Sequence, residues 1–299
     1  MWIRSLVACL VVWLAAAAPA VAQRTETLAF APHVPNVVPR GVMVLRGPPP
    51  AQITGTLRLP PGTGRVPAVL ILHGSGGVDG RGHMYGQALA DAGIASLEID
   101  MFTPRGVSQN NIDTARPRPT DALPDVFGAL RAMAAHPRLD GGRLGVMGFS
   151  FGGILSTLVA TAPVGGTYGP RSPAVRGVMP FYPPCYLFTE GGGPFAAMIG
   201  SRFPRMPMLM LVAGRDDYDA DGGESCRRLL AAGSPEAQPN ATLHIYPNAT
   251  HAWEGVRTGS FSDRAAARGR GGHVTIQRDP AATADSIART VAFFREVLR

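Results

Sequence analysis

The sequence predicts an α/β fold with a mostly parallel central sheet and helices on both faces. Continuous apolar runs of strand length recur along the chain, as in strands that are buried on both faces of a parallel sheet. Helix-like segments lie between these runs, and such alternation is typical of α/β domains. The length of 299 residues suits one domain of ordinary to large size.

The expected elements follow from these patterns in chain order. Residues 24–50 are rich in proline and valine and residues 52–59 have a strand-like pattern, so we expect edge strands from this region. Buried strands are expected at Val66–Leu72, Ile94–Ile99, Leu144–Phe149, Val175–Phe181, Met206–Ala213 and Ala241–Tyr246. Helices are expected at Tyr85–Ala92, Thr120–Ala135, Gly152–Thr161, Glu224–Ala232 and Thr283–Leu298. Loops that could form pocket walls are expected at residues 102–119, 163–173, 189–204 and 257–272.

The composition excludes some chemistries. All 28 basic residues are arginine, so neither a lysine Schiff base nor a phosphate-binding loop lysine is available. The 21 acidic residues leave a net charge of +7, which alone would allow a nucleic-acid partner. Because the arginines are scattered and no base-stacking module accompanies them, we predict no nucleic-acid binding; the pattern predicts no oligomeric state.

The N-terminus has the pattern of a secretory signal peptide. Residues 1–4 give a short positive start, residues 5–18 are apolar, and Ala20-Val21-Ala22 is a small-x-small cleavage site. An uncleaved membrane anchor is the alternative. With cleavage, residues 23–299 form a single exported domain, periplasmic or secreted, and no second apolar run predicts membrane association.

A candidate nucleophile follows the strand expected at Leu144–Phe149. The sequence GFSFGG at residues 148–153 places Ser150 in a G-x-S-x-G element before a helix-like segment. Glycines are needed on either side because the backbone turns sharply there, and the turn exposes the hydroxyl at the start of a helix. The alternative is a structural turn with an ordinary serine.

A serine nucleophile needs a general base and an acid that orients the base. The acid is expected before the histidine in the chain. His251 follows the strand expected at Ala241–Tyr246, and Asp216 and Asp217 follow the one at Met206–Ala213. All would lie at the same edge of the sheet as Ser150. We favour Asp217 as the acid and keep Asp216 as the alternative.

A glycine-rich turn, HGSGG at residues 73–77, follows the strand expected at Val66–Leu72. Its backbone amides could form an oxyanion hole together with the amide of Phe151. The turn lacks the spacing of a dinucleotide-binding loop. The other histidines show no metal-ligand spacing, so we expect no metal site: His33, His83, His136, His244 and His273.

These motifs, in this order, resemble the dienelactone hydrolase family of the α/β-hydrolase superfamily. The resemblance also rests on DMFTPRGV at residues 100–107 and on YPNATHAW at residues 246–253. It implies an α/β-hydrolase fold, a triad of Ser150, Asp217 and His251, and no cofactor. It also implies an oxyanion hole from Phe151 and the turn at residues 74–75, Gly74 and Ser75.

Two features depart from the family's pattern. The namesake enzymes use a cysteine nucleophile where this chain has Ser150, so the resemblance implies the activity class and not the substrate. The acid segment, residues 214–218, is one residue shorter than in similar exported proteins, which keeps Asp216 as a candidate.

Two interpretations remain for Arg105 and for the pair of Cys185 and Cys226. Arg105 could pair with a substrate carboxylate or anchor its own loop to an acidic neighbour. Cys9 would leave with the signal peptide, and Cys185 and Cys226 then form an even pair in an oxidising compartment. We expect a disulfide between them, with two buried free thiols as the alternative.

Together these residues predict a serine hydrolase that cleaves a small-molecule carboxylic ester or lactone through an acyl-enzyme on Ser150. A peptidase or an acyltransferase with the same triad is the nearest alternative. A protein that binds a ligand without turnover is the alternative from a different class.

Overall fold

The computed structural model describes residues 23–35, 47–191, 193–200, 203–233, 240–255 and 258–299. The signal peptide expected at residues 1–22, including Cys9, lies outside the described residues. None of the helices in the described ranges is long and apolar enough to cross a membrane.

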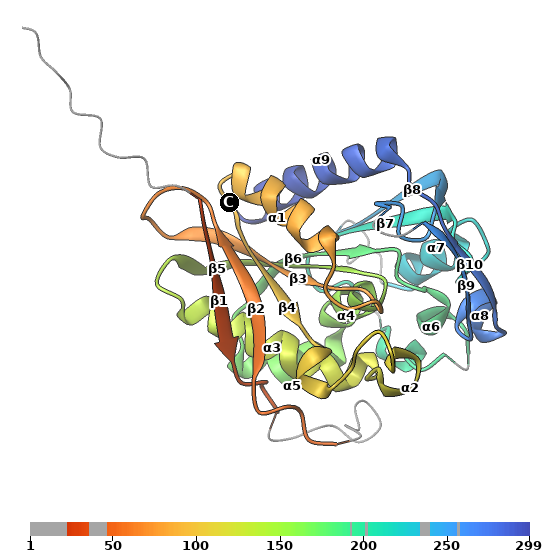
Figure 1. The fold of residues 1–299 in the computed structure, drawn as a ribbon, viewed down its shortest axis with the longest axis horizontal. Helices are drawn as coiled ribbons and strands as arrows, with labels where there is room; N and C mark the ends of the chain where they lie inside the picture. Colours follow the sequence, from red (N-terminus) through yellow and green to blue (C-terminus); the bar gives the residue numbers. More distant parts are fainter. Residues whose placement is uncertain (1–22, 36–46, 192, 201–202, 234–239, 256–257) are drawn as a thin grey trace, which may run out of the picture.

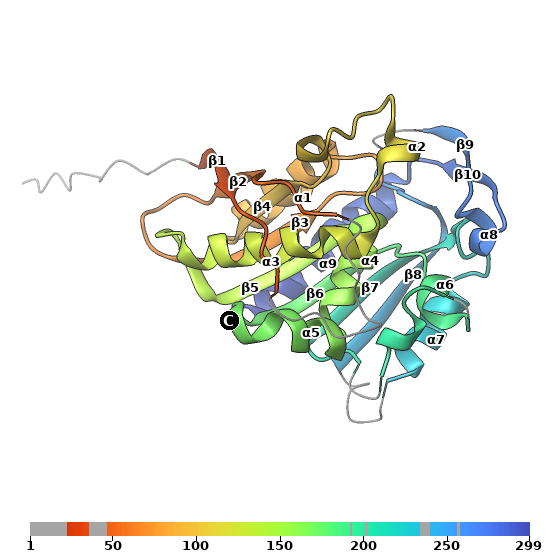
Figure 2. The ribbon, with the colours of Figure 1, turned by 90° about the horizontal axis from the view of Figure 1, so that it is seen from below.

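An eight-stranded sheet runs through the centre of the molecule (Figures 1 and 2). Its strands lie in the order β1-β2-β4-β3-β5-β6-β7-β8. The six strands from β3 to β8 are parallel, whereas β2 pairs antiparallel with both β1 and β4. Their bounds are β1 Arg24–Phe30, β2 Ile53–Leu59, β3 Val66–Leu72, β4 Ala95–Asp100, β5 Leu139–Phe149, β6 Val175–Phe181, β7 Met208–Arg215 and β8 Ala241–Thr250.

The continuous apolar runs explain the parallel core of the sheet. The last five residues of β3 and of β6 are fully buried, as the helices on the two faces require. In β2, by contrast, buried residues alternate with more accessible ones. We expected both N-terminal strands at the edge, but only β1 lies there, because β2 is paired on both sides.

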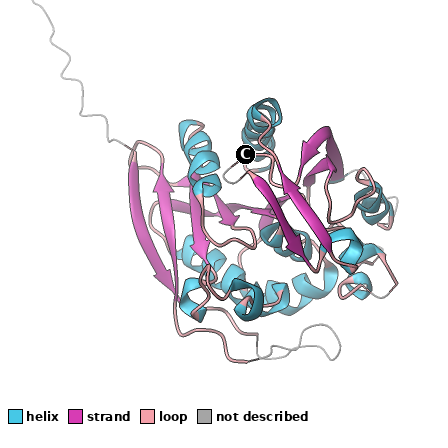
Figure 3. Ribbon diagram, turned by 45° about the vertical axis from the view of Figure 1, so that its right-hand side comes forward, coloured by secondary structure: helices cyan, strands magenta, loops and turns pink. Residues whose placement is uncertain are grey.

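Helices cover both faces of the sheet, as the sequence predicts (Figure 3). One apolar cluster joins α1 (Gly80–Asp91) and α9 (Pro280–Val297) to one face. The other cluster joins α3 (Pro119–Ala135), α4 (Phe151–Val159) and α7 (Glu224–Ala231) to the opposite face. The shorter helices are α2 Ile112–Ala115, α5 Ala162–Tyr168, α6 Tyr186–Thr189, α8 Ala266–Gly269, and the 3-10 turns η1 Thr103–Arg105, η2 Gly169–Arg171 and η3 Ala196–Met198.

A second, two-stranded sheet forms where we expected only a loop. β9 (Gly259–Asp263) and β10 (Gly272–Ile276) pair antiparallel beside the carboxyl ends of the main strands (Figure 1). Its side chains are mostly exposed, with Val274 as the buried exception. The sequence lacks an apolar run here because the hairpin buries little.

A disulfide joins Cys185 and Cys226, as expected from the cysteine count. Cys185 immediately precedes α6, and Cys226 lies in α7. Both residues are buried, and their Cα atoms are 5.1 Å apart. The bridge therefore fixes the loop after β6 against the helix that follows β7.

Candidate active site

Ser150 occupies a sharp turn between β5 and α4. Its backbone has a φ of 50° and a ψ of −103°, a conformation that costs energy for a residue with a side chain. A Cβ on Gly148 would lie 2.2 Å from the carbonyl oxygen of Gly152, and one on Gly152 would lie 2.2 Å from that of Leu72. Glycine is therefore required on both sides of the serine, as the motif predicts.

Ser150, His251 and Asp216 form a continuous hydrogen-bonded chain. The Ser150 Oγ atom lies 2.9 Å from His251 Nε2, and His251 Nδ1 lies 2.8 Å from Asp216 Oδ2. The three residues follow β5, β8 and β7 directly, so the parallel strands deliver them to one edge of the sheet. All three are buried, with at most 7% of each residue exposed.

The preference for Asp217 as the partner of His251 is wrong, and the alternative, Asp216, holds that place. Asp216 Oδ1 also accepts a hydrogen bond from the Tyr218 amide at 2.9 Å, which turns its carboxylate inward. Asp217 Oδ2 instead accepts the Thr275 amide at 2.8 Å. Asp217 therefore anchors the β9–β10 hairpin and does not face the histidine.

The glycine-rich turn at residues 73–77 follows β3 and lies beside Ser150. Gly77 donates its amide to the Gly74 carbonyl at 3.1 Å, which closes the turn. Gly74 and Ser75 line the same cavity as Ser150. Phe151 is the first residue of α4, and amides in the first turn of a helix have no acceptor within the helix. The turn and the first residue of α4 therefore both lie next to Ser150.

His73 fixes the glycine-rich turn through both of its ring nitrogens. Its Nε2 accepts the Met101 amide at 3.1 Å, so the proton lies on Nδ1, which donates to the Gly74 carbonyl at 2.8 Å. Burial lowers the pKa of His73, which favours this neutral form. The side chain therefore connects the turn to the residue that follows β4.

Arg105 does not reach the site. Its guanidinium forms two hydrogen bonds with the carboxylate of Asp125, at 2.6 and 3.1 Å, and another with the Met101 carbonyl at 2.7 Å. Arg105 is not among the described residues that line the two cavities around Ser150. The structure therefore contradicts a substrate-binding role and confirms the other interpretation, a loop anchor.

The sequence analysis missed a buried polar network behind the site. Arg81 donates to the Tyr182 hydroxyl at 3.1 Å, and Tyr182 donates to Glu254 at 2.9 Å. The Tyr182 ring also packs 4.8 Å from the His251 ring. Burial raises the pKa of the Glu254 carboxyl. Only the position of Glu254, three residues after His251, connects this network to a motif in the sequence.

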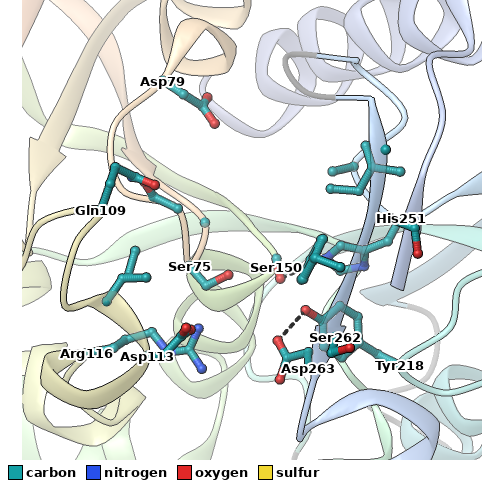
Figure 4. A pocket seen from close by; sticks show the side chains of 18 of the residues that line it. Ser75, Asp79, Gln109, Asp113, Arg116, Ser150, Tyr218, His251, Ser262 and Asp263 are labelled. Carbon is teal, nitrogen blue, oxygen red and sulfur yellow. Dashed lines mark hydrogen bonds between the residues drawn. The ribbon is translucent and has the colours of Figure 1, made fainter. Parts of the chain in front are cut away.

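Two cavities meet at Ser150. Figure 4 shows the one that includes His251. The histidine-side cavity, of about 370 Å³, includes His251 and Ala252 and is bounded on one side by the β9–β10 hairpin. The helix-side cavity, of about 590 Å³, lies against the start of α4, α6 and η3. The two share Ser75, Asp113, Arg116, Ser150, Tyr218 and Asp263.

The hairpin is tied to the segment after β7. The Tyr218 hydroxyl donates to Asp263 at 2.8 Å, a bond drawn in Figure 4. Arg268 reaches Asp221 at 2.8 Å and the Asp219 carbonyl at 2.9 Å. One wall of the histidine-side cavity is therefore held in place by residues adjacent to Asp216.

A family model described as the dienelactone hydrolase family matches residues 53–298. A curated Bradyrhizobium protein named "Probable 2-oxo-3-(5-oxofuran-2-ylidene)propanoate lactonase" is 31% identical over 128 residues, which are 40% of this chain. Those residues span 47% of that relative, about half of its length.

Solved structures share the fold at low sequence identity. A dienelactone hydrolase from Anabaena variabilis is 21% identical, with a TM-score of 0.57 over 92% of this chain and 99% of its own. Thermogutta terrifontis esterase 2, solved after phosphorylation by paraoxon, is 16% identical, with a TM-score of 0.59 over 82% of this chain and 89% of its own. The mostly parallel sheet with its surrounding helices is therefore an α/β-hydrolase-like fold.

Proposed function

We propose that this chain, which belongs to the dienelactone hydrolase family, cleaves a carboxylic ester or lactone through an acyl-enzyme on Ser150. The observation that supports this most is the hydrogen-bonded chain from Ser150 through His251 to Asp216. The family and its esterase neighbours support hydrolysis of esters or lactones in general. The acyl-enzyme and the triad are our own assignment.

In the first step, His251 Nε2 takes the proton of Ser150 as the Oγ atom attacks the carbonyl carbon. Asp216, bonded to Nδ1, keeps the imidazole in the tautomer with a free Nε2 and stabilises its charged form. The oxygen of the tetrahedral intermediate binds backbone amides of Phe151 and of the turn at Gly74 and Ser75.

In the second step, His251 returns the proton to the leaving alcohol, and the acyl group stays on Ser150. Water then enters beside His251, which takes its proton and directs the hydroxide to the acyl carbon. The acid leaves with one oxygen from water, and the proton returns to Ser150. In a lactone, the leaving hydroxyl remains attached to the acyl group.

The first experiment is intact-mass spectrometry after treatment with a fluorophosphonate. We expect one adduct on the wild-type protein and none on Ser150→Ala, because only an activated serine reacts at neutral pH. Retention of full esterase activity by Ser150→Ala would falsify the assignment. Product analysis with ester, amide and alcohol-acceptor substrates separates an esterase from a peptidase or an acyltransferase.

We further propose that residues 1–22 direct export and are removed, so that the mature single domain starts at Gln23. The disulfide between Cys185 and Cys226 supports an oxidising compartment. The same mass spectrum tests this: protein recovered from the periplasm or medium should begin at Gln23, and a full-length chain there would contradict it.

A further inference from the structure

The two cavities at Ser150 differ in what lines them. Outside the shared residues, side chains of the helix-side cavity are mainly apolar, and the most buried are Phe151, Ile154, Phe195 and Met198, each no more than 6% exposed. The histidine-side cavity combines polar and apolar side chains. Its unshared polar residues include Asp79, Arg81, Gln109, Thr258, Ser260 and Ser262, and its unshared apolar residues are Ile112, Ala252, Phe261 and Ile276.

The proposed reaction determines which part of the substrate lies in which cavity. The tetrahedral carbon has four substituents: Ser150 Oγ, the oxyanion, the leaving oxygen and the acyl chain. The oxyanion points to the amides, and the leaving oxygen must lie near His251, which protonates it. His251 lines the histidine-side cavity and is absent from the described lining of the helix-side cavity. The remaining substituent, the acyl chain, therefore lies in the helix-side cavity.

We infer that the substrate is an ester whose bulkier, apolar part is its acid, with an aryl or medium-length alkyl acyl group in the helix-side cavity and the alcohol part on the histidine side. This inference rests on the proposed function. Both cavities are within the size range that accommodates a small organic ligand, and the helix-side cavity, about 590 Å³, is larger than the histidine-side cavity, about 370 Å³. An apolar wall favours an apolar group by about fourfold for each buried CH₂.

Two esters that are constitutional isomers test which cavity takes the acyl chain, because they have the same overall hydrophobicity. Ethyl hexanoate and hexyl acetate have the same atoms, but the long chain lies on the acid in the first and on the alcohol in the second. Hydrolysis is followed by titrating the acid released at constant pH. We expect kcat/KM to be at least tenfold higher for ethyl hexanoate. Equal values, or a preference for hexyl acetate, would overturn the inference.

Two matched variants locate the effect. Leu187 and Ile276 are half-buried aliphatic residues, one in each cavity. Leu187→Trp should lower the ratio of the two kcat/KM values by at least fivefold, because the indole occupies space for the acyl chain. Ile276→Trp should leave that ratio unchanged or raise it. The inference fails if Ile276→Trp lowers the ratio as much as Leu187→Trp does.

The outcomes separate this inference from the function on which it rests. If neither ester is hydrolysed and the wild-type protein gains no fluorophosphonate adduct, the proposed function fails. If the adduct forms on Ser150 and both esters are cleaved without preference, only the acyl assignment fails. Thermal unfolding checks that each variant is folded. If a variant is unfolded, the ratio of kcat/KM for the two esters on the wild-type protein tests the inference by itself.

Discussion

Two buried aspartates in different parts of the molecule show how a partner determines a role. Asp216 follows β7 and is 7% exposed, and its Oδ2 meets His251 Nδ1 at 2.8 Å. Asp125 lies in α3, is fully buried, and receives both arms of the Arg105 guanidinium. Arginine stays charged over the physiological pH range, whereas histidine gains and loses a proton. Burial alone therefore does not identify a catalytic carboxylate.

The largest effect is expected on the rate, at the aspartate that faces the histidine. Asp216→Asn should lower kcat by about 10³- to 10⁴-fold, because an amide donating to Nδ1 forces the proton onto Nε2, which can then no longer accept the serine proton. Steady-state ester hydrolysis measures this. Asp217→Asn is the matched control and should retain at least a tenth of the wild-type kcat. Equal losses in both variants would remove the distinction between the two residues.

At the other aspartate, the large effect is expected on stability. Arg105→Met should lower the free energy of unfolding by about 3–5 kcal/mol, because it leaves Asp125 buried without its cation. Urea denaturation measures this, and adding Asp125→Leu should recover most of the loss. Loss of activity in Arg105→Met at unchanged stability would instead return Arg105 to the site.

A third carboxylate, that of Glu98 in β4, extends the comparison to a group without a histidine or arginine hydrogen bond among the described contacts. Burial, with a smaller contribution from Asp79, raises the pKa of Glu98 in β4 to about 7. A raised pKa means that the folded protein holds the proton more tightly, so this stabilisation is complete below about pH 4.5 and is lost as the pH rises through 7.

Glu98→Gln should therefore flatten the pH dependence of stability. Between pH 4.5 and 8 the wild-type protein should lose up to about 3 kcal/mol more unfolding free energy than the variant. Denaturant titrations at several pH values give the two slopes. Identical slopes would show that burial at Glu98 does not penalise its charge.

The smallest effect is expected at the hairpin anchor. Asp217→Ala removes the acceptor of the Thr275 amide, a hydrogen bond worth about 1 kcal/mol. Hydrogen exchange of the β10 peptide should become about fivefold faster, while that of the central strands stays unchanged. Unchanged exchange in β10 would show that the hairpin is held by its other contacts, such as Tyr218 with Asp263.

The sequence predicts well what depends on neighbouring residues. The parallel strands appear as continuous apolar runs, and the turn around Ser150 appears as its glycines, since both are local requirements. The place of His251 follows from the end of its strand. By contrast, Asp216 and Asp217 are adjacent in one turn, and the hydrogen bond from Tyr218 that orients the first of them has no signature in residue type alone.

The sequence also could not predict polar contacts between residues that are far apart in the chain. Arg105 meets Asp125 across 20 positions, and Arg81 meets Tyr182 across 101. Arginine is equally compatible with a substrate, a loop anchor or a buried network, and only the tertiary structure distinguishes these. The β9–β10 hairpin was missed because its strands are short and mostly polar, so they lack the pattern of a buried strand.

The space around Gly148 and Gly152 shows which positions of the turn tolerate a larger side chain. At Gly148 and Gly152, a single added methyl would lie 2.2 Å from a backbone oxygen, and backbone cannot turn aside as a side chain can. The side chain at position 150 instead opens onto both cavities. The surrounding backbone therefore constrains positions 148 and 152 more tightly than position 150.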